Sequence, residues 1–158
     1  ISRIDVMKGM TVEVRCEADL EVFGDRQFLG EVMINLIRNA AEACNGSGKI
    51  LVAARRDGDR IVIDVADDGP GVPVDRRSEI FKPFHSSKSY GTGIGLAFCR
   101  KVVESHGGTI DLVEQGQRGA CFRIDLPALP QTGTVGDQAS AAPVQGQAMQ
   151  SPASEPTK

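Results

Sequence analysis

Residues 60–71 read RIVIDVADDGPG, a strand-like run that ends in two carboxylates and then turns at two glycines and a proline. The alternation of apolar residues along the run is typical of a strand with one buried face. It places Asp67 on the same face as Ile61, Ile63 and Val65. We therefore expect the Asp67 carboxylate to point toward the core, where an unpartnered charge is costly.

The glycines after this strand leave the backbone bare. Gly69 and Gly71 permit a positive φ or the close approach of another group to the main chain. Together with Asp67 they would let a purine lie at the end of the strand, with its exocyclic amine bonded to the carboxylate. A surface turn with solvated acids explains the same residues, because Asp and Gly are common in turns. This stretch by itself leaves both interpretations open.

Outward from this strand, the patterns alternate between strands and helices. The run 49–57 also alternates, and Asp57-Gly58-Asp59 predicts a hairpin between the two runs. The other extended segments are expected at 10–16, 20–25, 109–115 and 120–127. Helices are expected at 26–44, where Asp25 is the cap, at 93–105 and, as a short piece, at 76–81. This order predicts an α/β two-layer sandwich, with a mixed, mostly antiparallel sheet and helices on one face.

Size and composition limit the class of protein. The chain has 158 residues, the size of one domain, and a net charge of −3 with scattered Lys and Arg, so no nucleic acid is expected as a partner. Four separated cysteines without metal-ligand spacing favour reduced thiols in a cytoplasmic protein. No apolar run approaches the roughly 18 residues of a membrane span. Because the chain starts at Ile1, we expect a fragment, and an anchor could precede it.

The C-terminal segment differs from the rest of the chain. Residues 128–158 are rich in Pro, Gln, Ala, Ser and Gly and have few large apolar side chains. Such a segment cannot bury enough surface to offset its chain entropy. We expect a folded domain at 1–127 and a disordered tail at 128–158.

The helix expected at 26–44 carries a polar stripe of Glu31, Asn35, Asn39 and Glu42 beside a broad apolar face. Asn is a poor helix former, so two of them one turn apart need a reason. An Asn oxygen can bind Mg²⁺, and its amide can donate to a phosphate. An ordinary amphipathic helix with a solvated polar side is an equally good explanation of this stripe alone.

Residues 90–96 read YGTGIGL and lead into the second long helix. Gly91, Gly93 and Gly95 bring bare backbone to a helix N-terminus, where free N–H groups and the helix dipole attract anions. The GxGxG spacing excludes a P-loop and the dinucleotide-binding fingerprint. A flexible loop before a helix is the alternative.

The segment IFKPF at 80–84 lies between the two glycine clusters. Phe81 and Phe84 are expected to be core anchors that hold a loop down. Lys88 is a candidate phosphate contact, and a solvated lysine is the alternative.

In this order and spacing, the motifs resemble the catalytic ATP-binding domain of bacterial sensor histidine kinases, within the superfamily of gyrase, Hsp90, histidine kinase and MutL ATPases. EVMINLIRNAAEA is similar to the N box, DDGPG to the first glycine box, IFKPF to the F box and GTGIGL to the second glycine box. The resemblance covers about residues 11–127. PFHSSK and the short segment before Gly91 are similar to nitrogen- and oxygen-sensing kinases. The implied fold is the Bergerat ATP-binding fold.

The resemblance implies ATP and Mg²⁺ as cofactors and a role for each motif. Asp67 would accept a hydrogen bond from the adenine amine, and Asn39 would give an oxygen to Mg²⁺. Asn35 and Lys88 would be catalytic, with Lys88 at the γ-phosphate. The implied nucleotide-binding residues are Asn35, Asn39, Asp67, Gly69, Gly71, Lys88, Gly91, Thr92, Gly93, Ile94, Gly95 and Leu96. Many members have a basic and an aromatic residue where this chain has Glu42 and Ala43, so no basic contact is assigned there.

The resemblance also implies the reaction. The gyrase branch has a glutamate that activates water at the position of Asn35, and an amide cannot be a general base. Phosphoryl transfer is therefore expected rather than hydrolysis. His85 and His106 lack the family's acceptor context, so the acceptor histidine is expected on a dimerisation domain outside this chain. A response regulator would be the next partner, the fragment would be monomeric, and the full-length protein would be a homodimer. The alternatives are an anti-sigma-type serine kinase and a degenerate nucleotide-binding module.

Overall fold

The computed structural model describes residues 2–7, 9–85, 93–114 and 119–130. In chain order the elements are β1 (Ser2–Met7), β2 (Met10–Cys16), α1 (Arg26–Ala43), β3 (Gly48–Asp57), β4 (Arg60–Asp67), the 3-10 helix η1 (Val74–Arg76), α2 (Gly95–Ser105), β5 (Thr109–Val113) and β6 (Cys121–Pro127). Neither α1 nor α2 combines the length and the apolar character that crossing a membrane requires.

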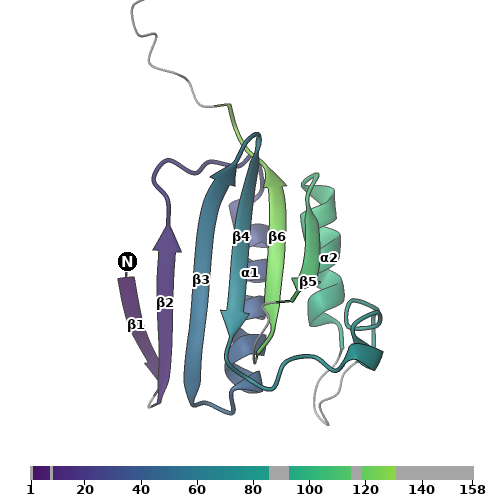
Figure 1. Ribbon diagram of the computed structural model, residues 1–158. Coiled ribbons are helices and arrows are strands. Elements are labelled where there is room, and N and C mark those ends of the chain that lie inside the picture. Colours follow the sequence, from purple (N-terminus) through teal and green to yellow (C-terminus); the bar gives the residue numbers. More distant parts are fainter. Residues whose placement is uncertain (1, 8, 86–92, 115–118, 131–158) are drawn as a thin grey trace, which may run out of the picture.

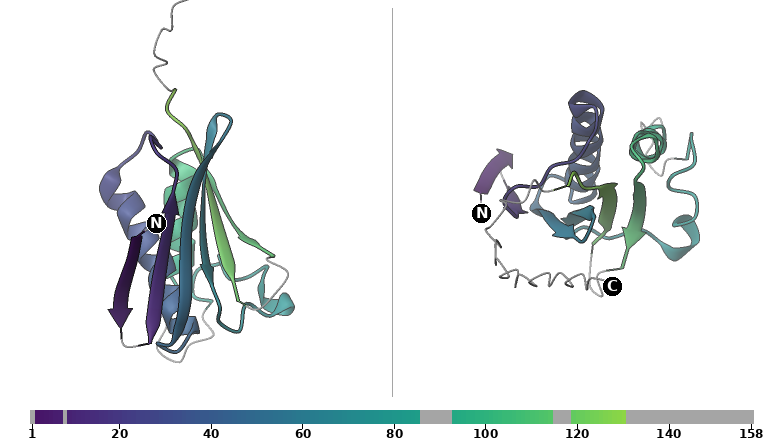
Figure 2. Two further views of the ribbon diagram at one scale, coloured as in Figure 1. Left: turned by 60° about the vertical axis from the view of Figure 1, so that its left-hand side comes forward. Right: turned by 90° about the horizontal axis from the view of Figure 1, so that it is seen from above.

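The six strands form one sheet in the order β1-β2-β3-β4-β6-β5. Neighbouring strands are antiparallel except for β2 and β3, which are parallel. Both helices lie against the same face of the sheet (Figure 1), and the view from above shows the two layers clearly (Figure 2). The expected two-layer α/β sandwich with a mixed, mostly antiparallel sheet is confirmed.

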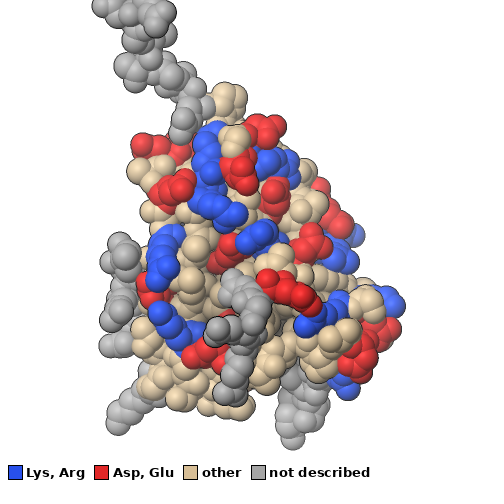
Figure 3. All heavy atoms as spheres, in the orientation of Figure 1, with Lys and Arg blue, Asp and Glu red and all other residues tan. Residues whose placement is uncertain are grey.

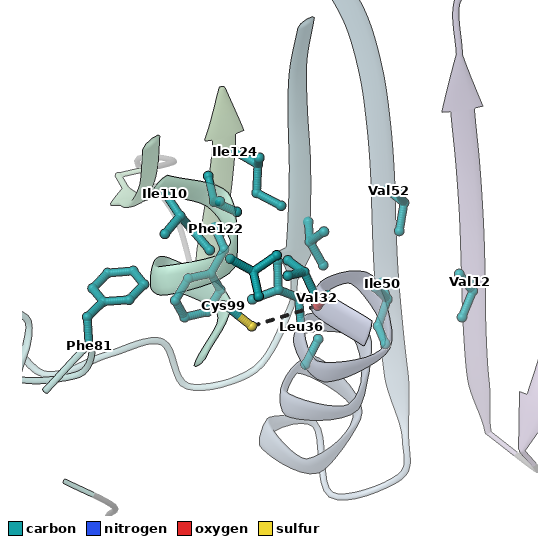
Figure 4. Packing of buried hydrophobic residues seen from close by; sticks show 14 of the residues in the cluster. Val12, Val32, Leu36, Ile50, Val52, Phe81, Cys99, Ile110, Phe122 and Ile124 are labelled. Carbon is teal, nitrogen blue, oxygen red and sulfur yellow. Dashed lines mark hydrogen bonds between the residues drawn. The ribbon is translucent and has the colours of Figure 1, made fainter. Parts of the chain in front are cut away.

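The core lies between the helices and the sheet. Leu36 and Val32 of α1 pack there with Ile50, Val65 and residues of β5, β6 and α2 (Figure 4). α1 begins as expected, because the Asp25 carboxylate accepts hydrogen bonds from the backbone N–H groups of Gln27 (2.8 Å) and Phe28 (3.2 Å). Capping and an apolar face thus fix α1 against the centre of the sheet.

The opposite face of the sheet carries ion pairs. Arg123 binds Asp64 at 2.7 Å and Arg55 binds the same carboxylate at 3.3 Å. Glu13 is bonded to Lys49 and Arg15, which lower the pKa of its carboxyl to about 2. Figure 3 shows acidic and basic side chains interspersed over this face. These ion pairs make the sheet face opposite α1 and α2 polar.

Several elements differ from the sequence expectations. Strand β1 was not predicted, and the helix predicted at 76–81 is wrong. That segment forms η1 and then successive turns, with hydrogen bonds from Glu79 N–H to the Arg76 carbonyl and from Lys82 N–H to the Glu79 carbonyl. These bonds span three residues, the spacing of a 3-10 helix rather than an α-helix. A rigid proline at position 73 precedes them.

The chain stays attached to the domain just after the expected boundary at residue 127. The backbone N–H of Ala128 donates to the Asp59 carbonyl and that of Leu129 donates to the Glu21 carbonyl, both at 2.8 Å. Val22 forms an isolated antiparallel β-bridge with Ala128. Val22 belongs to the extended segment expected at 20–25. The expected tail from residue 131 onward lies outside the described residues.

Replacing Leu36 by Ala tests this packing. Leu36 has no exposed surface, so we expect Leu36→Ala to lower the free energy of unfolding by about 2–5 kcal/mol. Ile34 on the same helix is 58% exposed, and Ile34→Ala should change the free energy of unfolding by about 0.5 kcal/mol or less. Urea denaturation followed by circular dichroism measures both. Equal losses in the two variants would contradict the assigned orientation of α1.

Candidate nucleotide-binding site

The carboxylate of Asp67 is held firmly at the end of β4. Its Oδ1 atom accepts hydrogen bonds from the backbone N–H groups of Gly69 (2.9 Å) and Ala120 (3.3 Å). The Asp67 backbone N–H in turn donates to the Ala120 carbonyl at 2.9 Å. The residue is only 9% exposed, as the alternation along the strand predicted. Both backbone donors use the same oxygen, so Oδ2 takes neither of these bonds.

The environment of Asp67 makes its negative charge costly. Burial raises the pKa of the carboxyl above its ordinary 3.8. The hydrogen bonds from Gly69 and Ala120 oppose this rise, and the neighbouring charge of Asp68 adds to it. A desolvated carboxylate with a fixed orientation is well suited to bind a neutral group that donates a hydrogen bond.

Two glycines after Asp67 are required by contacts within the protein. A Cβ atom on Gly69 would lie 2.8 Å from Asp67 Oδ1 and 3.2 Å from the Ala43 Cβ. Gly71 has a φ of +77°, and a Cβ there would lie 2.7 Å from the Gly119 carbonyl oxygen. These contacts bring the end of β4, the end of α1 and the start of β6 together. The close approach of a ligand to these glycines stays a prediction.

Asp68 turns away from Asp67 and joins two neighbouring elements. Its Oδ1 accepts hydrogen bonds from the Lys49 backbone N–H at 3.0 Å and from the Cys44 thiol at 3.3 Å. Burial and the bond to Asp68 raise the pKa of the Cys44 thiol to about 11. Cys44 is therefore a protonated donor at neutral pH, and the Asp68 carboxylate links the end of α1 to the start of β3.

The side chain of Asn35 lies directly against the N-terminus of α2. A Cβ on Gly95 would be only 2.6 Å from Asn35 Oδ1, so no other residue fits there without moving the amide. The same oxygen accepts a hydrogen bond from Arg38 Nη2 at 3.2 Å. Ile94, the N-cap of α2, has no polar side chain to satisfy the first N–H groups. Asn35 and an anion-attracting helix end are thus brought together.

The other predicted residues follow these elements. Asn39 is half-buried on α1, one turn after Asn35, and Leu96 packs against the core. Ile94 is partly exposed beside Gly95. Lys88, Gly91 and Thr92 lie outside the described residues. The structure thus brings Asn35 and Gly95 into contact and places Asn39 on the same helix.

The F-box segment has one buried anchor rather than two. Phe81 is 8% exposed, packs edge-on against Phe122 with ring centroids 6.1 Å apart, and lies 3.9 Å from the Arg100 guanidinium. Phe84 is 80% exposed, which corrects the expectation that it anchors the core. Its φ of +65° is unusual for a residue with a side chain. The turn directs this ring outward while Phe81 enters the core.

Phe84 also contacts Gly93, the residue that precedes the N-cap of α2. Its backbone N–H donates to the Gly93 carbonyl at 3.1 Å. Gly93 has a φ of +66°, and a Cβ there would lie 2.6 Å from the Phe84 carbonyl carbon. Residues 84 and 93 therefore lie together, close to the N-terminus of α2.

Sequence reasoning missed three residues around this site. Ala120 binds Asp67 through its backbone, which gives no signal in the side-chain pattern. Arg38 and Arg100 are basic residues on amphipathic helices, where solvated side chains are the usual explanation. Only the packing of Arg38 on Asn35 and of Arg100 on Phe81 distinguishes them.

Comparisons with known proteins show the family to which this fold belongs. Residues 24–130 match the family model described as histidine kinase-, DNA gyrase B-, and HSP90-like ATPase. Sporulation kinase B of Bacillus subtilis is 38% identical over 77% of this chain and 28% of its own length. The sensory histidine kinase/phosphatase NtrB of Rhodobacter capsulatus is 41% identical over 68% of this chain and 34% of its own. The chain thus spans about a third or less of these curated relatives.

Solved structures match at the level of the whole domain. The catalytic domain of histidine kinase ThkA has a TM-score of 0.66 at 34% identity, covering 73% of this chain and 78% of its own. Full-length ShkA in complex with AMPPNP has a TM-score of 0.67 at 29% identity, covering 77% of this chain and 26% of its own. ThkA in complex with the response regulator TrrA has a TM-score of 0.66 at 30% identity, covering 78% and 36%.

These matches confirm the fold and the likeness to sensor histidine kinases, and they include the nitrogen regulation protein NtrY of Azorhizobium caulinodans, 38% identical over 66% of this chain and 14% of its own length. The chain belongs to the histidine kinase-, DNA gyrase B- and HSP90-like ATPase family, and it is a histidine kinase catalytic, ATP-binding domain.

Proposed function

We propose that this domain binds Mg·ATP with Asp67 on the adenine, and transfers the γ-phosphate to a histidine on a dimerisation domain outside the chain. The observation that carries this proposal is the buried Asp67 carboxylate, which two backbone N–H groups hold by a single oxygen. Kinase relatives and a neighbour solved with AMPPNP support it. The folded catalytic unit is proposed to be residues 1–127, followed by a tail at 128–158.

The adenine assignment follows from hydrogen-bonding chemistry. Oδ2 of Asp67 can accept from the exocyclic amine of adenine, whereas guanine presents a carbonyl oxygen at the same ring position. Two acceptors facing each other in a desolvated site leave both groups unpaired, which costs free energy. The fixed orientation of Asp67 therefore favours ATP over GTP.

The distance along α1 suits a nucleoside triphosphate. Ala43 lies beside Gly69 at the Asp67 end, and Asn35 contacts Gly95 at the other. Eight residues of helix separate Ala43 from Asn35, a rise of about 12 Å. This length is comparable to that of an extended ATP, so the phosphates would reach Asn35 and the N-terminus of α2. That end of the helix attracts anions.

Asn39 is the residue proposed to hold Mg²⁺. A neutral amide oxygen fits a hard cation whose other ligands are phosphate oxygens and water. Such an ion neutralises charge as a phosphoryl group is transferred. Asn35 cannot take a proton from water because an amide is not a base near neutral pH. The site thus orients the phosphates without activating water, which favours transfer to an acceptor.

The proposed partners follow from the reaction. A dimerisation domain would supply the acceptor histidine, because His106 is already engaged: its Nε2 accepts the Asp25 backbone N–H at 3.0 Å. A response regulator is proposed as the next acceptor, by analogy with the complex of ThkA. We further propose that the fragment is monomeric, that the full-length protein is a homodimer, and that the domain works in the cytoplasm, where ATP is supplied. No nucleic acid partner is proposed.

Asp67→Asn tests the adenine contact. We expect the affinity for Mg·AMPPNP, measured by isothermal titration calorimetry, to fall at least about tenfold, because a charge-assisted bond is replaced by a weaker one. Asp59→Asn makes the same chemical change in the exposed hairpin and should leave the affinity unchanged. Retention of full affinity by Asp67→Asn would contradict the assignment.

Binding and stability should also depend on pH through Asp67. Because burial raises its pKa, the folded protein keeps this proton to a higher pH than the unfolded chain, and ionisation costs stability as pH rises above 3.8. The free energy of unfolding of Asp67→Asn, relative to that of the wild type, should therefore increase from pH 4 to pH 7. Nucleotide affinity of the wild type should decrease on acidification. If the difference in free energy of unfolding between Asp67→Asn and the wild type does not change with pH, the Asp67 carboxylate is not destabilised by burial.

Phosphotransfer is tested by mixing the chain with Mg·ATP and a separately produced dimerisation domain of a histidine kinase such as NtrB. We expect labelled phosphate on that domain in an acid-labile, alkali-stable form, as phosphohistidine has. An acid-stable phosphoester on serine would instead support the serine-kinase alternative. ATP binding without transfer to acceptor domains from several relatives would contradict the kinase proposal.

A further inference from the structure

We propose that Arg38 contacts the terminal phosphate of the bound nucleotide and is the basic residue of this N box. This inference rests on the proposed nucleotide site and adds a residue to it. The sequence motifs assigned no basic side chain of α1 to a phosphate, because Glu42 and Ala43 stand where many family members have a basic and an aromatic residue.

The orientation of Arg38 is defined by its contact with Asn35. Arg38 is exposed, lies three residues after Asn35 on α1, and donates from Nη2 to Asn35 Oδ1 at 3.2 Å. A guanidinium has only donors, so the oxygen of the amide must face it. Asn35 then has its NH₂ group available for a phosphate. The guanidinium keeps its other N–H groups for a second acceptor.

The two helices place Arg38 beyond the N-terminus of α2. Asp25 at the start of α1 meets His106 at the end of α2, and Asn35 meets Gly95 at the start of α2. The helices therefore run antiparallel, and residue 38 is past the point where α2 begins. Helical side chains point toward the N-terminus of their helix, which brings the Arg38 guanidinium back to the level of Asn35. That level is the phosphate end of the site.

Electrostatics agree with this placement. Burial raises the pKa of the Cys99 thiol on α2 to about 12, and the charge of Arg38 opposes that rise. The field of Arg38 thus extends over the first turns of α2. Its guanidinium contacts a neutral amide, whereas Lys82 and His85 in the F-box segment both lie beside the Glu79 carboxylate, at 3.2 and 3.6 Å. Within the described residues, the hydrogen-bond partner that the structure shows for Arg38 is thus a neutral amide, which does not compensate the charge of the guanidinium.

The test compares AMPPNP with ADP by calorimetry in the presence of Mg²⁺, using the whole chain. For Arg38→Gln we expect the affinity for AMPPNP to fall roughly 10- to 100-fold, the loss of a charge-assisted hydrogen bond. The affinity of the same variant for ADP, which lacks the terminal phosphate, should change by less than about twofold. Arg38→Lys should recover part of the loss, because a point charge remains.

Arg26→Gln is the matched control, since it removes the same charge from the first turn of α1 and should bind both nucleotides as the wild type does. Thermal unfolding of each variant identifies any loss of structure. Equal losses for AMPPNP and ADP in folded Arg38→Gln, or no loss for either, would overturn the assignment of Arg38. Failure of the wild type to bind even ADP would instead overturn the proposed nucleotide site itself.

Discussion

The bonds from Gly69 and Ala120 to one oxygen of Asp67 set the geometry on which the rest of the site depends. They fix a desolvated carboxylate at the end of β4 and bring the start of β6 against it. The contact between Gly69 and Ala43 then places the end of α1 beside the same carboxylate. The polar stripe of α1 consequently extends from the carboxylate toward the N-terminus of α2, and Asp67 would determine where both ends of the proposed nucleotide lie.

Helix α1 serves the core and the site with neighbouring sides. Leu36 and Val32 pack against the sheet, while Asn35 contacts Gly95 at the N-terminus of α2. The N-terminus of α2 is in turn joined to the F-box segment by the hydrogen bond between Phe84 and Gly93. Phe81, held between Arg100 and Phe122, connects that segment to the core. Packing of the core therefore controls the position of each polar group.

The sequence predicted the sandwich and most of its elements because strong patterns define them. Alternation along β4 gave the buried orientation of Asp67, and Asp25 gave the start of α1. Local patterns could not predict β1, because its formation depends on pairing with β2 in the folded protein. They could not predict the outward turn of Phe84 either, because it depends on a positive φ. The glycine pattern was informative for a partly different reason from the one expected: Gly69, Gly71 and Gly95 are required by protein neighbours, which sequence spacing does not reveal. Arg38 escaped notice because a basic residue on the polar side of a helix is usually solvated, and its contact with Asn35 on the same helix is seen only in the structure.

An NMR titration of the ¹⁵N-labelled chain with Mg·AMPPNP is the most direct test of the central claim that Asp67 anchors a nucleotide along α1. The account predicts that the backbone amide signals of Gly69 and Ala120 and the side-chain amide signals of Asn35 and Asn39 shift together, with one affinity. The signal of Gly58, in the hairpin at the other end of β4, should stay in place. Shifts that leave Gly69 and Ala120 unchanged while other regions respond would contradict the account.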